Sequence, residues 1–165
     1  MNNKAVKIAL VIVLVLTGGY LYNKYRVAPS VAFNTLQLVD SNEQPVTLTT
    51  YNGQPLLVSF FATWCGPCVH ELPSLIQAQQ LLHSKNVRVI LISDENNALL
   101  DRVRSRYPEL IVLHSVKKLP ELDIATIPTT YLLNSKHQQV YKKVGEEEWH
   151  SESMIEKIND KLADN

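Results

Sequence analysis

The two cysteines of the chain lie in one short segment, Trp64-Cys65-Gly66-Pro67-Cys68, in which two residues separate the thiols. An apolar run over residues 56–61 predicts a buried strand just before this segment, and a helix is expected to begin within it. A thiol at a helix N-terminus faces unpaired N–H groups and the positive end of the helix dipole, which stabilise a thiolate. The pattern therefore predicts thiol–disulfide chemistry, with Cys65 as the exposed nucleophile and Cys68 as the more buried resolving thiol.

Other uses of paired cysteines fit this sequence less well. A structural zinc site requires four ligands, and only His70 lies close to the pair. Covalent haem attachment requires His directly after the second cysteine, where Val69 stands. A purely structural disulfide over so short a loop would stabilise the fold little. A redox role is therefore favoured, with no metal and no other cofactor expected.

Composition limits the class of protein. The 165 residues include 45% hydrophobic residues, which argues against a disordered chain. Lys and Arg number 16, as do Asp and Glu, and this zero net charge argues against binding to nucleic acid through bulk electrostatics. The length fits one domain of ordinary size.

The N-terminal segment differs from the remainder. Residues 8–22 form an uncharged apolar run, with Lys4 and Lys7 before it and Lys24 and Arg26 after it. We interpret residues 1–26 as a single-pass membrane anchor with the domain outside the cytoplasm, although the run is short for a span of about 20 residues. A cleaved signal sequence remains the alternative. Residues 27–33 are predicted to be a linker and residues 34–165 the domain.

Strand and helix patterns alternate along this domain. Together they predict an α/β fold with a central mixed β-sheet flanked by helices and an added N-terminal β-hairpin. The expected strands cover residues 34–39, 46–48, 56–61, 87–92, 111–113, 129–133 and 139–144, and the expected helices end at residue 82 or cover residues 97–106 and 154–162.

Three stretches carry a resemblance to a known family: residues 59–68 (SFFATWCGPC), Glu71-Leu72-Pro73 and residues 127–133 (IPTTYLL). Over residues 33–162 the chain resembles thioredoxin, and more specifically the membrane-anchored TlpA/ResA-like thiol–disulfide oxidoreductases. The resemblance implies a thioredoxin-like fold in which Cys65 and Cys68 form a redox-active disulfide.

Glu71 is the third predicted catalytic residue. Its i, i+3 spacing from Cys68 places both side chains on one helix face. From spacing alone, a solvated surface carboxylate is an equal alternative. Ser59 stands where cytoplasmic thioredoxins usually carry a buried Asp, and the TlpA/ResA-like proteins instead have a Glu at the position of Glu71. The resemblance therefore implies that Glu71 handles protons.

Pro128 is the second element of the predicted site. From sequence alone its peptide bond would be expected to be trans, but the resemblance implies a cis proline that faces the cysteines and leaves the Ile127 backbone free to pair with a substrate strand. An ordinary proline at the start of a strand is the alternative. The predicted substrate-binding residues are Trp64, Gly66, Pro67, Ile127, Pro128 and Thr129.

These features predict an enzyme in the cytoplasmic membrane whose catalytic domain lies in the periplasm or an equivalent space. We expect it to reduce disulfides of exported proteins and to be re-reduced by a membrane-embedded electron donor. By resemblance, the substrates include apocytochromes during cytochrome c maturation. A disulfide oxidase or isomerase and a thioredoxin-fold module that binds Cu(I) remain alternatives.

Overall fold

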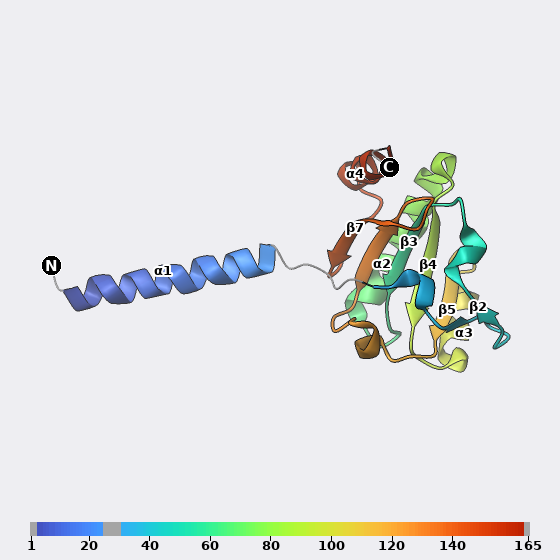
Figure 1. The fold of residues 1–165 in the computed structure, drawn as a ribbon, viewed down its shortest axis with the longest axis horizontal. Helices are drawn as coiled ribbons and strands as arrows, with labels where there is room; N and C mark the ends of the chain where they lie inside the picture. The colour runs from blue at the N-terminus through green and yellow to red at the C-terminus, as the bar shows by residue number, and fades with distance from the viewer. Residues whose placement is uncertain (1–2, 25–30, 164–165) are drawn as a thin grey trace.

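The computed structural model describes residues 3–24 and 31–163 (Figure 1). The helices are α1 (Asn3–Lys24), α2 (Gly66–Leu81), α3 (Asn97–Arg106) and α4 (Glu152–Ala163). The strands are β1 (Leu38–Val39), β2 (Pro45–Val46), β3 (Leu56–Phe60), β4 (Arg88–Ser93), β5 (Ile111–Ser115), β6 (Thr129–Leu133) and β7 (Gln139–Val144). Short 3-10 helices are η1 (Phe33–Thr35), η2 (Leu48–Tyr51), η3 (His83–Lys85) and η4 (Leu119–Leu122).

The described strands form one seven-stranded sheet in the order β2-β1-β5-β4-β3-β6-β7. Neighbours β3, β4 and β5 are parallel, whereas β1 pairs antiparallel with β5 and β6 pairs antiparallel with β3. All five residues of β3 and of β6 are buried, as expected for apolar strands covered on both faces. The predicted mixed sheet is therefore confirmed.

Two apolar clusters cover the two faces of the sheet. On one face, α2, α3 and α4 contribute side chains such as Leu72, Leu100 and Ile158. The other cluster includes side chains from the strands, from η2 and η4, and from the residues before β1, such as Val31 and Phe33. Helices α2, α3 and α4 thus cover one face, and packing against the other begins within the segment predicted to be a linker.

The N-terminal hairpin is present but shorter than predicted. Each of its strands has two residues, because residues 33–35 and 48–51 form 3-10 helices that bury Phe33 and Leu48. In the connecting turn the Asp40 carboxylate accepts hydrogen bonds from the backbone N–H groups of Asn42 and Gln44. Apolar alternation alone did not distinguish these turns from strand.

Helix α1 contains the uncharged run of the N-terminal segment. Over the residues that the structure describes, no helix combines the length and the apolar character required to cross a bilayer. The transmembrane anchor predicted for residues 1–26 is therefore not confirmed.

Candidate functional site

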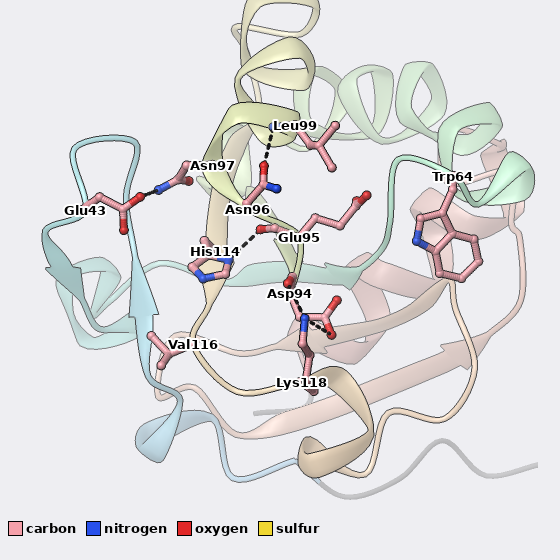
Figure 2. A pocket seen from close by; sticks show the side chains of 10 residues that line it. All are labelled: Glu43, Trp64, Asp94, Glu95, Asn96, Asn97, Leu99, His114, Val116 and Lys118. Carbon is pink, nitrogen blue, oxygen red and sulfur yellow. Dashed lines mark hydrogen bonds and ion pairs between the residues drawn. The ribbon is translucent and has the colours of Figure 1, made fainter.

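The loops that carry the predicted site meet at one edge of the sheet. Because β3, β4 and β5 are parallel, their carboxyl ends lie together, and this is where ligands bind in open α/β sheets. Thr129 pairs with Phe60 at the end of β3, which brings the Ile127–Pro128 bond to the same edge. A hollow of about 600 Å³ opens there beside Trp64 (Figure 2).

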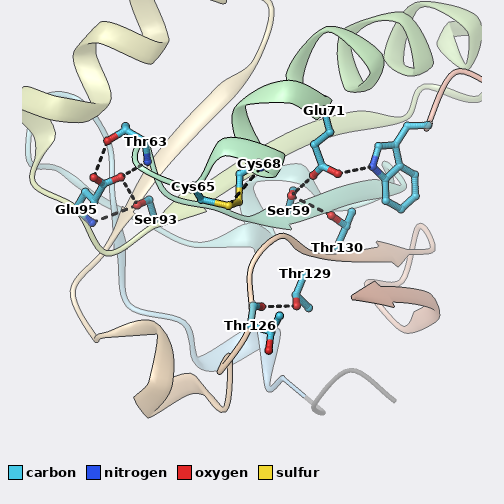
Figure 3. Close-up of a disulfide and its surroundings, with 11 residues drawn as sticks. Ser59, Thr63, Cys65, Cys68, Glu71, Ser93, Glu95, Thr126, Thr129 and Thr130 are labelled. Carbon is cyan, nitrogen blue, oxygen red and sulfur yellow. Dashed lines mark hydrogen bonds between the residues drawn. A yellow bond between two sulfur atoms is a disulfide. The ribbon is translucent and has the colours of Figure 1, made fainter. Parts of the chain in front are cut away.

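Cys65 and Cys68 form a disulfide at the start of α2, with an S–S distance of 2.08 Å (Figure 3). Cys65 is the N-cap of this helix, and its sulfur accepts a hydrogen bond from the Cys68 backbone N–H at 3.3 Å. Pro67 lies in the first turn, as predicted. The position required for stabilising a thiolate by the helix N-terminus is therefore present.

Cys65 is less exposed than the sequence predicted. Only 6% of its surface is exposed, and it belongs to the apolar cluster that contains Cys68 and Leu72. Cys68 is fully buried, so Cys65 is still the more accessible of the two. The neighbouring Trp64 is 75% exposed.

Glu71 lies inside the protein, with only 2% of its surface exposed. The Ser59 hydroxyl donates to one carboxylate oxygen at 3.2 Å, and the Trp149 indole N–H donates to the other at 3.3 Å. The Thr130 hydroxyl in turn donates to Ser59 at 2.9 Å. Burial excludes the alternative of a solvated surface carboxylate.

The environment of Glu71 changes its acidity. Burial raises the pKa of Glu71 to about 7, and the hydrogen bonds from Trp149 and Ser59 oppose this shift in part. Desolvation dominates because it penalises only the charged form. A carboxyl group with this pKa can accept or release a proton near neutral pH.

The Ile127–Pro128 peptide bond is cis, as the resemblance implied. The Pro128 carbonyl accepts a hydrogen bond from Gly145 N–H at 2.8 Å. Among the predicted substrate-binding residues, Trp64, Gly66 and Pro67 are exposed and Ile127 is half-buried, whereas Pro128 and Thr129 are buried. The Thr129 hydroxyl donates to the Thr126 carbonyl at 2.6 Å, so its side chain is engaged within the protein.

Trp149 is a site residue that the sequence did not reveal. It belongs to the segment between β7 and α4, which contacts α2 through three pairs of side chains. Glu146 contacts His70 and thereby raises the pKa of His70, Trp149 binds Glu71, and His150 binds Ser74. No local motif predicts these contacts, because 78 residues separate Trp149 from Glu71.

Glu95 is the second unexpected residue. Its carboxylate accepts hydrogen bonds from the backbone N–H and the hydroxyl of Thr63, two residues before Cys65. Within the described parts of the chain, no group of three His, Cys, Asp or Glu side chains is arranged to hold a metal ion.

Comparison with known proteins agrees with this geometry. A family model described as Redoxin matches residues 26–159. Thiol-disulfide oxidoreductase ResA of Bacillus subtilis (strain 168) is 25% identical over 162 residues, covering 91% of this chain and 88% of the relative. Sporulation thiol-disulfide oxidoreductase A of the same strain is 36% identical over 102 residues, which cover 56% of this chain and 61% of the relative.

A solved structure shares the fold. It is that of a thiol:disulfide interchange protein, a thioredoxin family protein, from Chlorobium tepidum TLS. The TM-score is 0.62 at 22% sequence identity, over 82% of this chain and 97% of the other. The thioredoxin-like fold that the sequence predicted is thereby confirmed.

Proposed function

Because this chain belongs to the Redoxin family and is a thiol–disulfide oxidoreductase, we propose that it reduces disulfides of exported proteins outside the cytoplasm. The observation that carries the proposal is the Cys65–Cys68 disulfide at the N-terminus of α2, with a buried carboxyl group, Glu71, one turn further along the same helix.

The reaction proceeds in two exchanges. In the reduced enzyme the Cys65 thiolate attacks a substrate disulfide, so that a Cys65–substrate bond forms and the substrate S–S bond breaks. The first substrate thiolate leaves and takes up a proton. Glu71 then accepts the proton of Cys68, and the Cys68 thiolate attacks the Cys65 sulfur. The Cys65–Cys68 disulfide forms and the Cys65–substrate bond breaks, so that the second substrate thiolate leaves and takes up a proton. Two electrons have then passed to the substrate.

The burial of Cys68 and the position of Glu71 support the proposed reducing direction. Groups that stabilise a thiolate stabilise the reduced form and make a disulfide more oxidising. Here Cys68 is fully buried and Glu71 lies one turn away, and both features disfavour a second negative charge. The Gly66-Pro67 dipeptide is also the one found in reducing thioredoxins, which the chain resembles.

We expect the reduction potential of the Cys65–Cys68 couple to lie near the thioredoxin value of about −270 mV, and well below the value of about −120 mV typical of strong disulfide oxidants. The measurement equilibrates the protein in dithiothreitol buffers, alkylates the free thiols and counts them by mass spectrometry. A potential above about −180 mV, in the range of disulfide isomerases, would contradict the reducing role.

The proposed location rests on the N-terminal segment. Residues 8–22 carry no charge, and the seven large apolar side chains from Leu10 to Leu16 are each more than half exposed. Such a surface is costly in water and is suited to lipid. We propose that this segment holds the domain on the outer side of the cytoplasmic membrane, where a membrane-embedded donor re-reduces it and exported proteins, including apocytochromes, are its substrates.

Protease added to intact spheroplasts should therefore degrade residues 34–165, and these residues should sediment with membranes before the treatment. A variant that lacks residues 1–26 is the control, and it should stay in the cytoplasm and be protected. Protection of the full-length protein would contradict the proposed location. A soluble domain that begins near residues 31–33 would show a cleaved signal instead of an anchor.

A further inference from the structure

We propose that Glu95 is a positioning residue for thiol–disulfide exchange, which holds the turn that carries Cys65 at the N-terminus of α2. Glu95 belongs to the loop after β4, and it acts on Cys65 through Thr63. The inference rests on the proposed role of Cys65 as the attacking thiol. It does not depend on the direction of electron flow or on the location of the protein.

The Glu95 carboxylate accepts three hydrogen bonds (Figure 3). One carboxylate oxygen accepts from Thr63 N–H at 2.6 Å and from the Ser93 hydroxyl at 3.3 Å, and the other accepts from the Thr63 hydroxyl at 2.7 Å. Hydrogen bonds to an ionised acceptor are about twice as strong as neutral ones. A bidentate arrangement also fixes the direction in which Thr63 points.

Glu95 itself is held by the sheet edge. Its backbone N–H donates to the Ser93 hydroxyl at 3.2 Å, and its carbonyl contacts His114 Nδ1 at 2.7 Å (Figure 2). Residues of β4 and β5 therefore hold the backbone of Glu95 in place. Glu95 is half-buried, so water competes less for these hydrogen bonds than at an open surface.

The turn between β3 and α2 is joined to Glu95 through Thr63. The hydrogen bond from Phe61 N–H to the Ile92 carbonyl ties the end of β3 to β4, and the bond from Cys65 N–H to the Ala62 carbonyl closes the turn. Thr63 lies between these two bonds, and Glu95 is the partner that joins it to another element. Movement of Thr63 would thus move Cys65 relative to the helix.

This restraint matters most when the disulfide is open. In the oxidised protein the S–S bond itself holds Cys65 in the first turn of α2. After reduction that covalent link is lost, and the Cys65 thiolate keeps its contact with the helix N-terminus only if the turn keeps its shape. Small displacements are costly, since a misplacement of about 1 Å can slow a reaction by about 10²-fold.

The test compares four variants in the reduced state: Glu95→Gln, Glu95→Ala, Thr63→Val and, as a matched control, Asp94→Asn. Asp94 lies beside Glu95 but contacts Lys118 and the Leu119 N–H instead of Thr63. The pH dependence of iodoacetamide alkylation is measured at each cysteine by peptide mapping. Urea unfolding reports the stability of each variant.

We expect Glu95→Ala to raise the pKa of the Cys65 thiol and to slow its alkylation at pH 7 by about tenfold. Thr63→Val keeps the N–H contact and should shift the profile less, in the same direction, and it serves as the test if Glu95→Ala does not fold. Glu95→Gln retains an acceptor for Thr63 N–H and should stay close to the wild type. Asp94→Asn should do the same.

Two results would overturn the inference. A loss of stability in Glu95→Ala and Thr63→Val with no change in the Cys65 profile would show a structural role only. A lowered Cys65 pKa in both Glu95→Gln and Asp94→Asn would show that Glu95 acts as a nearby negative charge. Faster labelling of Cys68 than Cys65 in the wild type would instead refute the thiol roles of the proposed function, before any variant is compared.

Discussion

Replacing Glu71 with Gln is expected to slow the second exchange, in which Cys68 attacks the mixed disulfide, by about 10²-fold. The first exchange should proceed at nearly the wild-type rate, because Cys65 takes its stabilisation from the start of α2. Gln keeps the shape of Glu71 and can still bond to Trp149 and Ser59, but it cannot accept the Cys68 proton. Stopped-flow mixing of the reduced protein with a small disulfide separates the two phases.

The pH dependence of the second phase gives a sharper test. Since burial raises the pKa of Glu71 to about 7, the carboxylate needed as a base is lost as pH falls through neutrality. The wild-type rate should therefore drop below about pH 7, and Glu71→Gln should lack this inflection. Glu156→Gln, which removes an exposed carboxylate from α4, is the matched control and should behave as the wild type.

Glu71 also links stability to pH in the oxidised protein, in which neither cysteine titrates. Its pKa is higher in the folded state than its ordinary value of 4.5, so the folded state binds more protons between these two values. The stabilisation is present below about pH 4.5 and is lost as pH rises through about 7, with a total on the order of 3 kcal/mol. Glu71→Gln should flatten this dependence. If both kinetic phases and the stability profile stay unchanged, Glu71 has no role in proton transfer.

Local patterns in the sequence predicted the central elements well. The ranges of α3, β6 and β7 agree with the expected ones, and β3 differs by one residue. These elements have strong periodicity or short apolar runs with clear boundaries. The hairpin was predicted less well, because Phe33 and Leu48 are buried by 3-10 turns that share the apolar pattern of strands.

In the candidate site, too, some residues could be predicted from the sequence and others could not. Cys65, Cys68, Glu71 and Pro128 belong to short motifs and could be selected from the sequence. Trp149 and Glu95 could not, because each reaches the site from a distant part of the chain. Only the pairing of the strands and the path of the β7–α4 segment bring them to Glu71 and Thr63. The buried Glu71 carboxylate likewise binds the buried Trp149 indole, and this contact cannot be predicted from spacing along a helix.

In the proposed reaction Cys65 attacks the substrate and Cys68 resolves the mixed disulfide, and this order can be tested by capture of the mixed disulfide. Reduced Cys68→Ala protein should retain insulin through Cys65 in a disulfide that persists during non-reducing electrophoresis and is mapped by mass spectrometry. In the wild type Cys68 is held three residues from Cys65, and an intramolecular attack of this kind gains several orders of magnitude in rate. The wild-type mixed disulfide should therefore decay too quickly to accumulate.

The matched variant is Cys65→Ala, which keeps the buried thiol of Cys68 and removes the accessible one. We predict abundant capture by Cys68→Ala, through Cys65 alone, and none by Cys65→Ala. Capture by Cys65→Ala in place of Cys68→Ala, or by neither variant, would contradict the assignment of the two thiols.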